Sequence, residues 1–246
     1  MRSFLTAVGF MTSVPVHLSA WKEDDAGKSS FWYPLIGILI GLSCAGFYYL
    51  AEIIFPHLIS AALVLIFWIV LTGGLHLDGL CDCLDGFIYA GTKERRLEIM
   101  KDPHHGTFAF LGLFSALLLK YVSILSLPVS LCWIVFPMAA SMGRWGILLM
   151  IRLPTVRPDG MAANLKKFVP VWYLWGSLIL ILSVAVWHFP ETIYLILSGL
   201  ILIDLIAILC RRKIGGVTGD VLGMTIELTE IVVLLMSCLL KYKGML

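Results

Sequence analysis

The sequence predicts an all-α polytopic membrane protein with about seven transmembrane helices. Of its 246 residues, 60% are hydrophobic and only 14% are charged, and the mean hydropathy is +0.95. Soluble domains contain about a quarter charged residues, so the composition excludes that class, together with the disordered and disulfide-rich secreted classes. Seven spans of about 20 residues would use more than half of the chain. We therefore expect residues 1–246 to form one integral-membrane domain, with the lipid bilayer and no nucleic acid as a partner.

Seven apolar segments account for this composition. The third, fourth and sixth each continue past one charged residue, and the seventh reaches a spanning length only if it includes Glu227 and Glu230. In chain order, the expected spans are Phe31–Ala51, Leu58–Leu77, Gly106–Leu127, Leu131–Ile151, Phe168–Trp187, Thr192–Cys210 and Val221–Leu240.

Basic residues are unevenly distributed between the connections. Fourteen of the eighteen Lys and Arg residues precede the first span or lie between spans 2 and 3, 4 and 5, or 6 and 7. The intervening turns, near Pro56–Ile59, Leu127–Ser130 and His188–Glu191, contain none. By the positive-inside rule, the basic connections face the cytoplasm. We predict a cytoplasmic N-terminus and a multi-pass protein of the cell (inner) membrane.

The first twenty residues have some features of a secretory signal peptide. Arg2 precedes an apolar stretch that ends in Leu18-Ser19-Ala20, a sequence similar to a cleavage site. Polar residues and Pro15 interrupt this stretch. We therefore favour an interfacial or re-entrant segment on the cytoplasmic side over a cleaved leader.

An acidic cluster follows the second span. Asp78, Asp82 and Asp85 are spaced i, i+4 and i+7, which places them within about 60° of one another on one helix face. Three carboxylates so close repel one another unless a cation lies among them. Ligands that are all oxygen favour magnesium, manganese or calcium over zinc. We predict a Mg²⁺ site, and the alternative is a solvated polar face at a helix end with Asp78 as its cap.

A basic run follows the acidic cluster. Arg95 and Arg96 offer planar guanidinium groups suited to phosphate, and Lys101 offers a point charge. A run of this kind is also a common determinant of membrane topology. Beside a metal held by carboxylates, it favours a site for a phosphorylated substrate.

A second group of polar residues lies at the start of the seventh span. Asp220 and Glu227 are seven residues apart, and Glu230 is three residues further on. Ionisable residues inside a span are costly and usually face a partner or a pathway. Asp220 and Glu227 are candidates for substrate binding, whereas the structural alternative pairs Glu227 or Glu230 with Arg144 or Lys120. For Asp204, within the sixth span, we expect an intramembrane ion pair.

At these stretches the sequence closely resembles the cobalamin synthase family, adenosylcobinamide-GDP ribazoletransferase. The segments that carry the resemblance are Thr72–Gly86, Glu94–Asp102, Arg144-Trp145 and Gly216–Glu230. It covers essentially the whole chain. Two departures are Cys81-x-Cys83-Leu84, where small or hydroxyl residues are expected, and His104-His105, where the family commonly has an Arg-containing pair.

The resemblance implies a Mg²⁺-dependent transfer between adenosylcobinamide-GDP and α-ribazole, or α-ribazole 5′-phosphate. The ribose hydroxyl attacks the phosphorus on the cobinamide side chain, and GMP leaves. The products are adenosylcobalamin, or its 5′-phosphate, and GMP. A homo-oligomer is compatible with the sequence.

The resemblance also suggests roles for the candidate residues. The three aspartates, Asp78, Asp82 and Asp85, would bind one or two Mg²⁺ ions, and Asp85 is a candidate to accept the hydroxyl proton. Asp220 and Glu227 would complete the metal site or orient the ribazole. The three basic residues, Arg95, Arg96 and Lys101, would bind the departing phosphate.

Two other interpretations remain open from the sequence. CDP-alcohol phosphotransferases also use Asp-rich membrane sites, but their later Gly-x3-Asp-x3-Asp element is missing after Asp85-Gly86. A cation transporter would use acidic residues within spans and helices broken near Gly73-Gly74 or Gly215-Gly216. Against transport, the charged clusters are predicted at the cytoplasmic face, and no inverted repeat is evident.

Overall fold

The computed structural model describes residues 1–17, 22, 24–186 and 190–246, and the cleavage-like Leu18-Ser19-Ala20 lies outside them. Within the described residues the regular elements are helices, and the one β-type pairing is an isolated parallel bridge between Thr155 and Val217. The elements are α1 (Arg2–Met11), α2 (Asp25–Ser29), η1 (Ser30–Trp32), α3 (Tyr33–Ile54), α4 (His57–Thr72), α5 (Leu75–Ile88), α6 (Lys93–Ile99), α7 (Thr107–Ser126), α8 (Val129–Met150), α9 (Met161–Phe168), α10 (Val171–Ala185), α11 (Thr192–Ile214) and α12 (Gly219–Tyr242).

The helices confirm an all-α protein with several membrane spans. Five helical segments are long and apolar enough to cross a bilayer, namely Asp25–Ile54, α7, α8, α11 and α12. Two bent pairs raise the number to as many as seven, because α4 meets α5 at 90° and α9 meets α10 at 95°. Each of the seven predicted apolar segments overlaps one of these helices, but the second, Leu58–Leu77, continues past the end of α4 into α5. The end of the fifth, at Trp187, lies outside the described residues.

Glycines at left-handed backbone positions separate the helices at two points. Gly73 and Gly74, with φ of +65° and +68°, end α4 and turn the chain into α5. Gly215, with φ of +91°, ends α11. Only glycine adopts this conformation without a steric cost from Cβ. After that turn, Thr218 caps α12 by accepting a hydrogen bond from the backbone N–H of Val221.

Two glycines one helical turn apart bring α3 against α8. A Cβ atom at Gly37 would lie 2.6 Å from the carbonyl oxygen of Ala140, and one at Gly41 would lie 2.3 Å from the nitrogen of Pro137. Such Gly-xxx-Gly spacing lets membrane helices approach backbone to backbone. The close contact places α8 in the centre of the bundle, where most of its residues are buried.

Charged side chains inside the bundle pair with one another. Lys120 Nζ of α7 lies 3.1 Å from Glu227 Oε2 of α12 and also pairs with Glu230. Arg144 of α8 pairs with Glu230, and both side chains are fully buried. The indole of Trp68 lies 4.6 Å from Lys120 Nζ. Glu227 was a candidate for substrate binding. In the structure it pairs with Lys120, as the structural alternative predicted.

Asp204 does not have the ion pair that we expected. It is exposed on α11, and no ion pair joins it to another residue in the described part of the chain.

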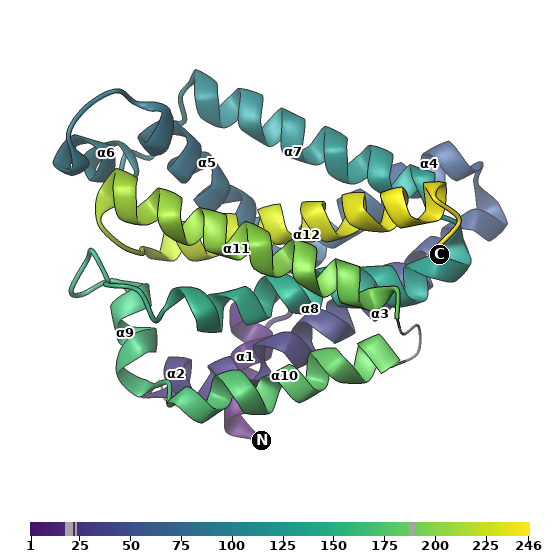
Figure 1. Ribbon diagram of the computed structural model, residues 1–246, viewed down its shortest axis with the longest axis horizontal. Coiled ribbons are helices and arrows are strands. Elements are labelled where there is room, and N and C mark those ends of the chain that lie inside the picture. Colours follow the sequence, from purple (N-terminus) through teal and green to yellow (C-terminus); the bar gives the residue numbers. More distant parts are fainter. Residues whose placement is uncertain (18–21, 23, 187–189) are drawn as a thin grey trace.

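The predicted basic connections lie together at one end of the bundle. Figure 1 shows α6, α9 and the turn between α11 and α12 at this end, and the C-terminus at the opposite end. Arg96 Nη1 donates a hydrogen bond to the carbonyl oxygen of Lys213 at 3.0 Å. The bridge between Thr155 and Val217 joins the connection after α8 to the one between α11 and α12. This end also holds the predicted site.

Candidate active site

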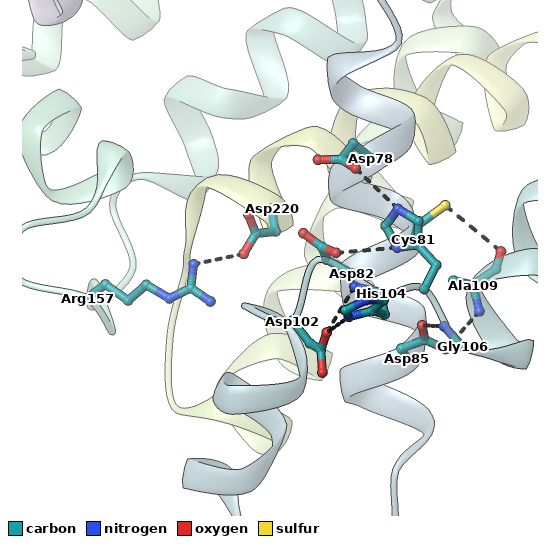
Figure 2. Close-up of polar contacts among 11 residues, drawn as sticks. Asp78, Cys81, Asp82, Asp85, Asp102, His104, Gly106, Ala109, Arg157 and Asp220 are labelled. Carbon is teal, nitrogen blue, oxygen red and sulfur yellow. Dashed lines mark hydrogen bonds and ion pairs between the residues drawn. The ribbon is translucent and has the colours of Figure 1, made fainter.

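The helix α5 carries all three predicted aspartates, as the spacing indicated. It packs closely against α12, because a Cβ atom at Gly79 would lie 2.8 Å from the carbonyl oxygen of Asp220. A Cβ atom at Gly223 of α12 would lie 3.2 Å from the carbonyl oxygen of His76. These two glycines let carboxylates from two helices face one space. Figure 2 shows Asp78, Asp82 and Asp220 around it.

The side chain of His105 lies between two of these carboxylates. Its Nε2 atom is 3.4 Å from Asp78 Oδ1, and its Nδ1 atom is 3.8 Å from Asp82 Oδ1. The Asp78 side chain is 63% exposed, whereas that of Asp82 is 16% exposed. One aspartate therefore faces solvent, and the other lies deeper at the same site.

Asp85 has a different environment from the other two aspartates. Its carboxylate accepts hydrogen bonds from the backbone N–H groups of Gly106, at 2.5 Å, and Ala109, at 2.9 Å. These groups begin α7, so Asp85 caps a helix distant in sequence. Figure 2 shows Asp85 directed toward Gly106 and away from Asp220. The structure brings together Asp78, Asp82 and Asp220 in place of the predicted triplet.

Asp220 is paired with an arginine from the connection between α8 and α9. Arg157 Nη1 lies 3.1 Å from Asp220 Oδ2, and Thr218 Oγ1 donates a hydrogen bond to the same oxygen at 3.2 Å. The Nε atom of Arg157 is buried and has no hydrogen-bond partner in the described part of the chain. Arg157 also lines an open hollow, where a guanidinium group is suited to a phosphate oxygen.

The three predicted phosphate-binding residues have different partners. Arg95 forms an exposed ion pair with Glu98, at 2.8 Å. Arg96 donates hydrogen bonds to the carbonyl oxygens of Tyr89 and Lys213, so it holds α6 against the end of α11. Lys101 is exposed beside Arg157 in the wall of an open hollow. Of the three, Lys101 has the position best suited to a ligand.

His104 and His105 contact different residues. His104 Nδ1 lies 2.8 Å from Asp102 Oδ1, and its backbone N–H donates to the same oxygen. The hydrogen bonds from the backbone and side chain of His104 lower the pKa of Asp102. This contact orders the loop before α7, while His105 reaches the aspartates.

The residues at the site suit a Mg²⁺ ion that shares its ligands with a substrate better than a metal held by protein ligands alone. Among the described residues, no three His, Cys, Asp or Glu side chains are close enough to surround a metal by themselves. Mg²⁺ usually keeps several waters and binds one or two carboxylates together with substrate phosphates. Asp78, Asp82 and Asp220 supply carboxylates, and the nearby hollow has room for phosphates. The residues present therefore fit Mg²⁺ bound jointly with a substrate.

Two hollows adjoin this cluster. A partly open cavity of about 180 Å³ is lined by Asp78, Asp220 and mainly apolar residues of α1, α5, α8, α9 and α12. An open hollow of about 420 Å³ is lined by Leu97 of α6, by Lys101 shortly after that helix, and by the connection before α9, including Asp159. Arg157 and Gly160 line both.

The fold and the site define a polytopic helical membrane protein with a carboxylate-rich site for phosphorylated ligands. The profile of the cobalamin-5-phosphate synthase family matches residues 3–238. The chain belongs to that family.

Three relatives illustrate the similarity, each named adenosylcobinamide-GDP ribazoletransferase. The protein from Pseudomonas putida (strain W619) is 37% identical over 245 residues, covering 96% of this chain and 98% of the relative. That from Desulfitobacterium hafniense (strain Y51) is 34% identical, with 98% of each chain covered. That from Chlorobaculum tepidum is 32% identical, covering 97% and 96%. No solved structure is significantly similar.

The comparisons confirm the resemblance inferred from the sequence. The matched family is not that of the CDP-alcohol phosphotransferases or of a cation transporter, so neither alternative gains support.

Two residues at the site, Arg157 and His105, are not among the candidates predicted from the sequence. In the sequence, Arg157 is only one of the four basic residues between the fourth and fifth spans. The acidic residue at the start of the seventh span, Asp220, was a sign that a cation could lie nearby. His105 was noted only as a departure from the family pattern. No local pattern links either residue to its aspartate, because 63 residues separate Arg157 from Asp220.

Proposed function

We propose that this protein joins adenosylcobinamide-GDP to α-ribazole, or to α-ribazole 5′-phosphate, in a late step of cobalamin biosynthesis. The products are adenosylcobalamin, or its 5′-phosphate, and GMP. The names of the relatives support this reaction. The observation that carries it is the convergence of Asp78, Asp82 and Asp220 beside a hollow that contains Lys101 and Arg157.

The reaction exchanges one bond at phosphorus. The ribose hydroxyl oxygen forms a bond to the phosphorus on the cobinamide side chain, and the bond from that phosphorus to the oxygen of GMP breaks. The hydroxyl proton passes to a carboxylate of the cluster. Arg157 and Lys101 lie where they can neutralise charge on the diphosphate and on the departing GMP.

We propose Mg²⁺ as the cofactor, held by Asp82 together with Asp78 or Asp220, with substrate phosphates and water as its other ligands. When bound, it would neutralise charge on the diphosphate oxygens and favour the departure of GMP. Asp85 was the third ligand predicted from the sequence. Because its carboxylate caps α7, we assign it to positioning the loop that carries His105.

The positive-inside rule supports an orientation for this site. The end of the bundle that holds the aspartates also holds the basic connections, which favour the cytoplasmic side. We therefore propose a multi-pass protein of the cell (inner) membrane, with a cytoplasmic N-terminus and an active site that faces the cytoplasm.

A reconstituted assay tests this function. Purified protein in liposomes receives adenosylcobinamide-GDP, α-ribazole and Mg²⁺, with or without EDTA, and chromatography follows cobalamin and GMP. We expect equal amounts of both products, and none with EDTA. Folded protein that forms neither product, with α-ribazole or with its 5′-phosphate, would contradict the proposal. Product formation unaffected by EDTA would contradict only the role of the metal.

A further inference from the structure

The partly open cavity beside the aspartates has a mainly apolar wall. Many of its apolar side chains come from five helices and include Phe10, Leu75, Ile147, Leu165, Leu222 and Ile226. Its charged side chains are Asp78, Arg157 and Asp220, which belong to the candidate active site. A ligand in the cavity would therefore meet hydrocarbon over most of its surface and the carboxylate cluster at one part of it.

The volume of about 180 Å³ limits what this cavity can hold. An apolar cavity of about 150 Å³ accepts benzene, whereas complete drug-sized ligands occupy about 300–1,000 Å³. The cavity is thus suited to one aromatic ring system and is too small for a corrin ring. Guanine suits it poorly, because its several donors and acceptors would lie unpaired against leucine and isoleucine.

One polar group in the wall can recognise an aromatic nitrogen. His76 lines the cavity and is 4% exposed. Its Nδ1 atom is buried without a hydrogen-bond partner in the described part of the chain. Buried polar atoms are nearly always paired with protein, water or a ligand, and a ligand in the cavity that His76 lines can be such a partner. The unsubstituted ring nitrogen of a benzimidazole accepts one hydrogen bond, which a neutral histidine can donate.

We propose that this cavity binds the bicyclic aromatic base of the nucleoside acceptor, with His76 as its polar contact. The inference rests on the proposed function. With the base in the cavity, the ribose lies toward Asp78, Asp220 and Arg157, because these residues belong to the same wall. Arg157 also lines the open hollow with Lys101, so that hollow takes the diphosphate of the donor. The two substrates then meet at Arg157 and the carboxylates.

A pair of alanines on α9 gives a matched test. Ala162 is 2% exposed and lines the cavity, whereas its neighbour Ala163 is half-buried and is not part of the wall. Equilibrium dialysis with α-ribazole alone measures binding without turnover. We expect Ala162→Leu to raise the Kd for α-ribazole by about tenfold or more, and Ala163→Leu to leave it unchanged. In the full assay, the KM for α-ribazole should rise while that for adenosylcobinamide-GDP stays constant.

His76 provides a second test that does not depend on filling the cavity. His76→Leu removes the ring nitrogen, whereas His76→Asn keeps a donor close to the position of Nδ1. We expect the Leu variant to lose about tenfold in affinity for α-ribazole and the Asn variant to recover part of it. Thermal unfolding in detergent identifies variants that remain folded.

The outcomes separate this inference from the proposed function. Wild-type protein that binds α-ribazole in the cavity but makes no cobalamin would contradict only the reaction. Active wild-type protein together with folded Ala162→Leu and His76→Leu variants of unchanged α-ribazole affinity would overturn the cavity assignment alone. A rise in the KM for the GDP-bearing donor without a rise for α-ribazole would also overturn it, and would assign the cavity to the donor.

Discussion

The carboxylate of Asp85 accepts a hydrogen bond at 2.5 Å from the backbone N–H of Gly106, and so caps the first turn of α7. A helix N-terminus has unpaired N–H groups and a partial positive charge. Removing an acidic cap costs about 1 kcal/mol. This relationship separates the role of Asp85 from that of the two aspartates before it.

We expect Asp85→Asn to lower the stability by about 1 kcal/mol and to keep most of the turnover. The asparagine retains an oxygen for one N–H but loses the charge that favours the helix end. Thermal unfolding in detergent and initial rates, measured on the same preparation, test this expectation. An unchanged melting temperature, with greatly reduced turnover and a higher Mg²⁺ requirement, would instead support the ligand role predicted from the sequence.

Asp82→Asn should abolish most of the activity without unfolding the protein. The substitution keeps the size of the side chain and removes a charge proposed to hold Mg²⁺. We expect kcat to fall by about 100-fold or more, as when one electrostatic contact to the transition state is lost. Glu94→Gln, at an exposed carboxylate of α6, is the control and should behave as wild type. Near-wild-type turnover of Asp82→Asn at saturating Mg²⁺ would rule out the metal role.

Gly79→Ala should separate the two helices that carry the carboxylates. The new Cβ would lie 2.8 Å from the carbonyl oxygen of Asp220, so α5 or α12 must move. Overpacking of this kind costs about 1–3 kcal/mol, and the displacement should also reduce turnover. Gly46→Ala in α3 is the control, because its Cβ would be 3.6 Å from the Trp133 ring, an ordinary contact. Equal stability and activity of the two variants would show that the close approach is unimportant.

The buried ion pairs should matter for stability and not for substrate affinity. Lys120→Met leaves Glu227 and Glu230 with one cation, Arg144, in place of two. Loss of one partner from a buried pair costs about 3–5 kcal/mol. Adding Glu227→Gln to Lys120→Met should restore part of that loss, as unfolding in detergent would reveal. If the folded double variant showed a raised KM for either substrate, Glu227 would bind substrate as the sequence suggested.

Local sequence patterns predicted most of the helices and placed the three aspartates on one helix. The spacing of Asp78, Asp82 and Asp85 requires only helical geometry, and α5 is a helix over all three. The break at Gly73 and Gly74 falls inside the predicted second span, Leu58–Leu77, and from the sequence such a break was associated only with a cation transporter. The predicted features depend on residues within two helical turns of one another, so the sequence contains the information needed to infer them.

Contacts between distant segments could not be inferred in the same way. The use of Asp85 depends on where α7 begins in space, and the pairing of Asp220 depends on the course of the loop that carries Arg157. In the sequence, nothing distinguishes Asp85 from Asp78 and Asp82, or shows which residue pairs with Asp220. Helix packing assigned Asp85 to a cap and Asp220 to the site.

The right angle between α4 and α5 has a consequence for how two unlike substrates meet. Asp78 and Asp82 are four residues apart on α5 and therefore about 6 Å apart along its axis. If α5 continued straight from α4, Asp78 and Asp82 would lie at different positions along the axis of α4. Because α5 turns by 90°, the two aspartates instead follow one another at right angles to that axis. A bulky corrinoid and a small nucleoside can then arrive side by side at one level, and neither has to carry a phosphate down into the hydrocarbon.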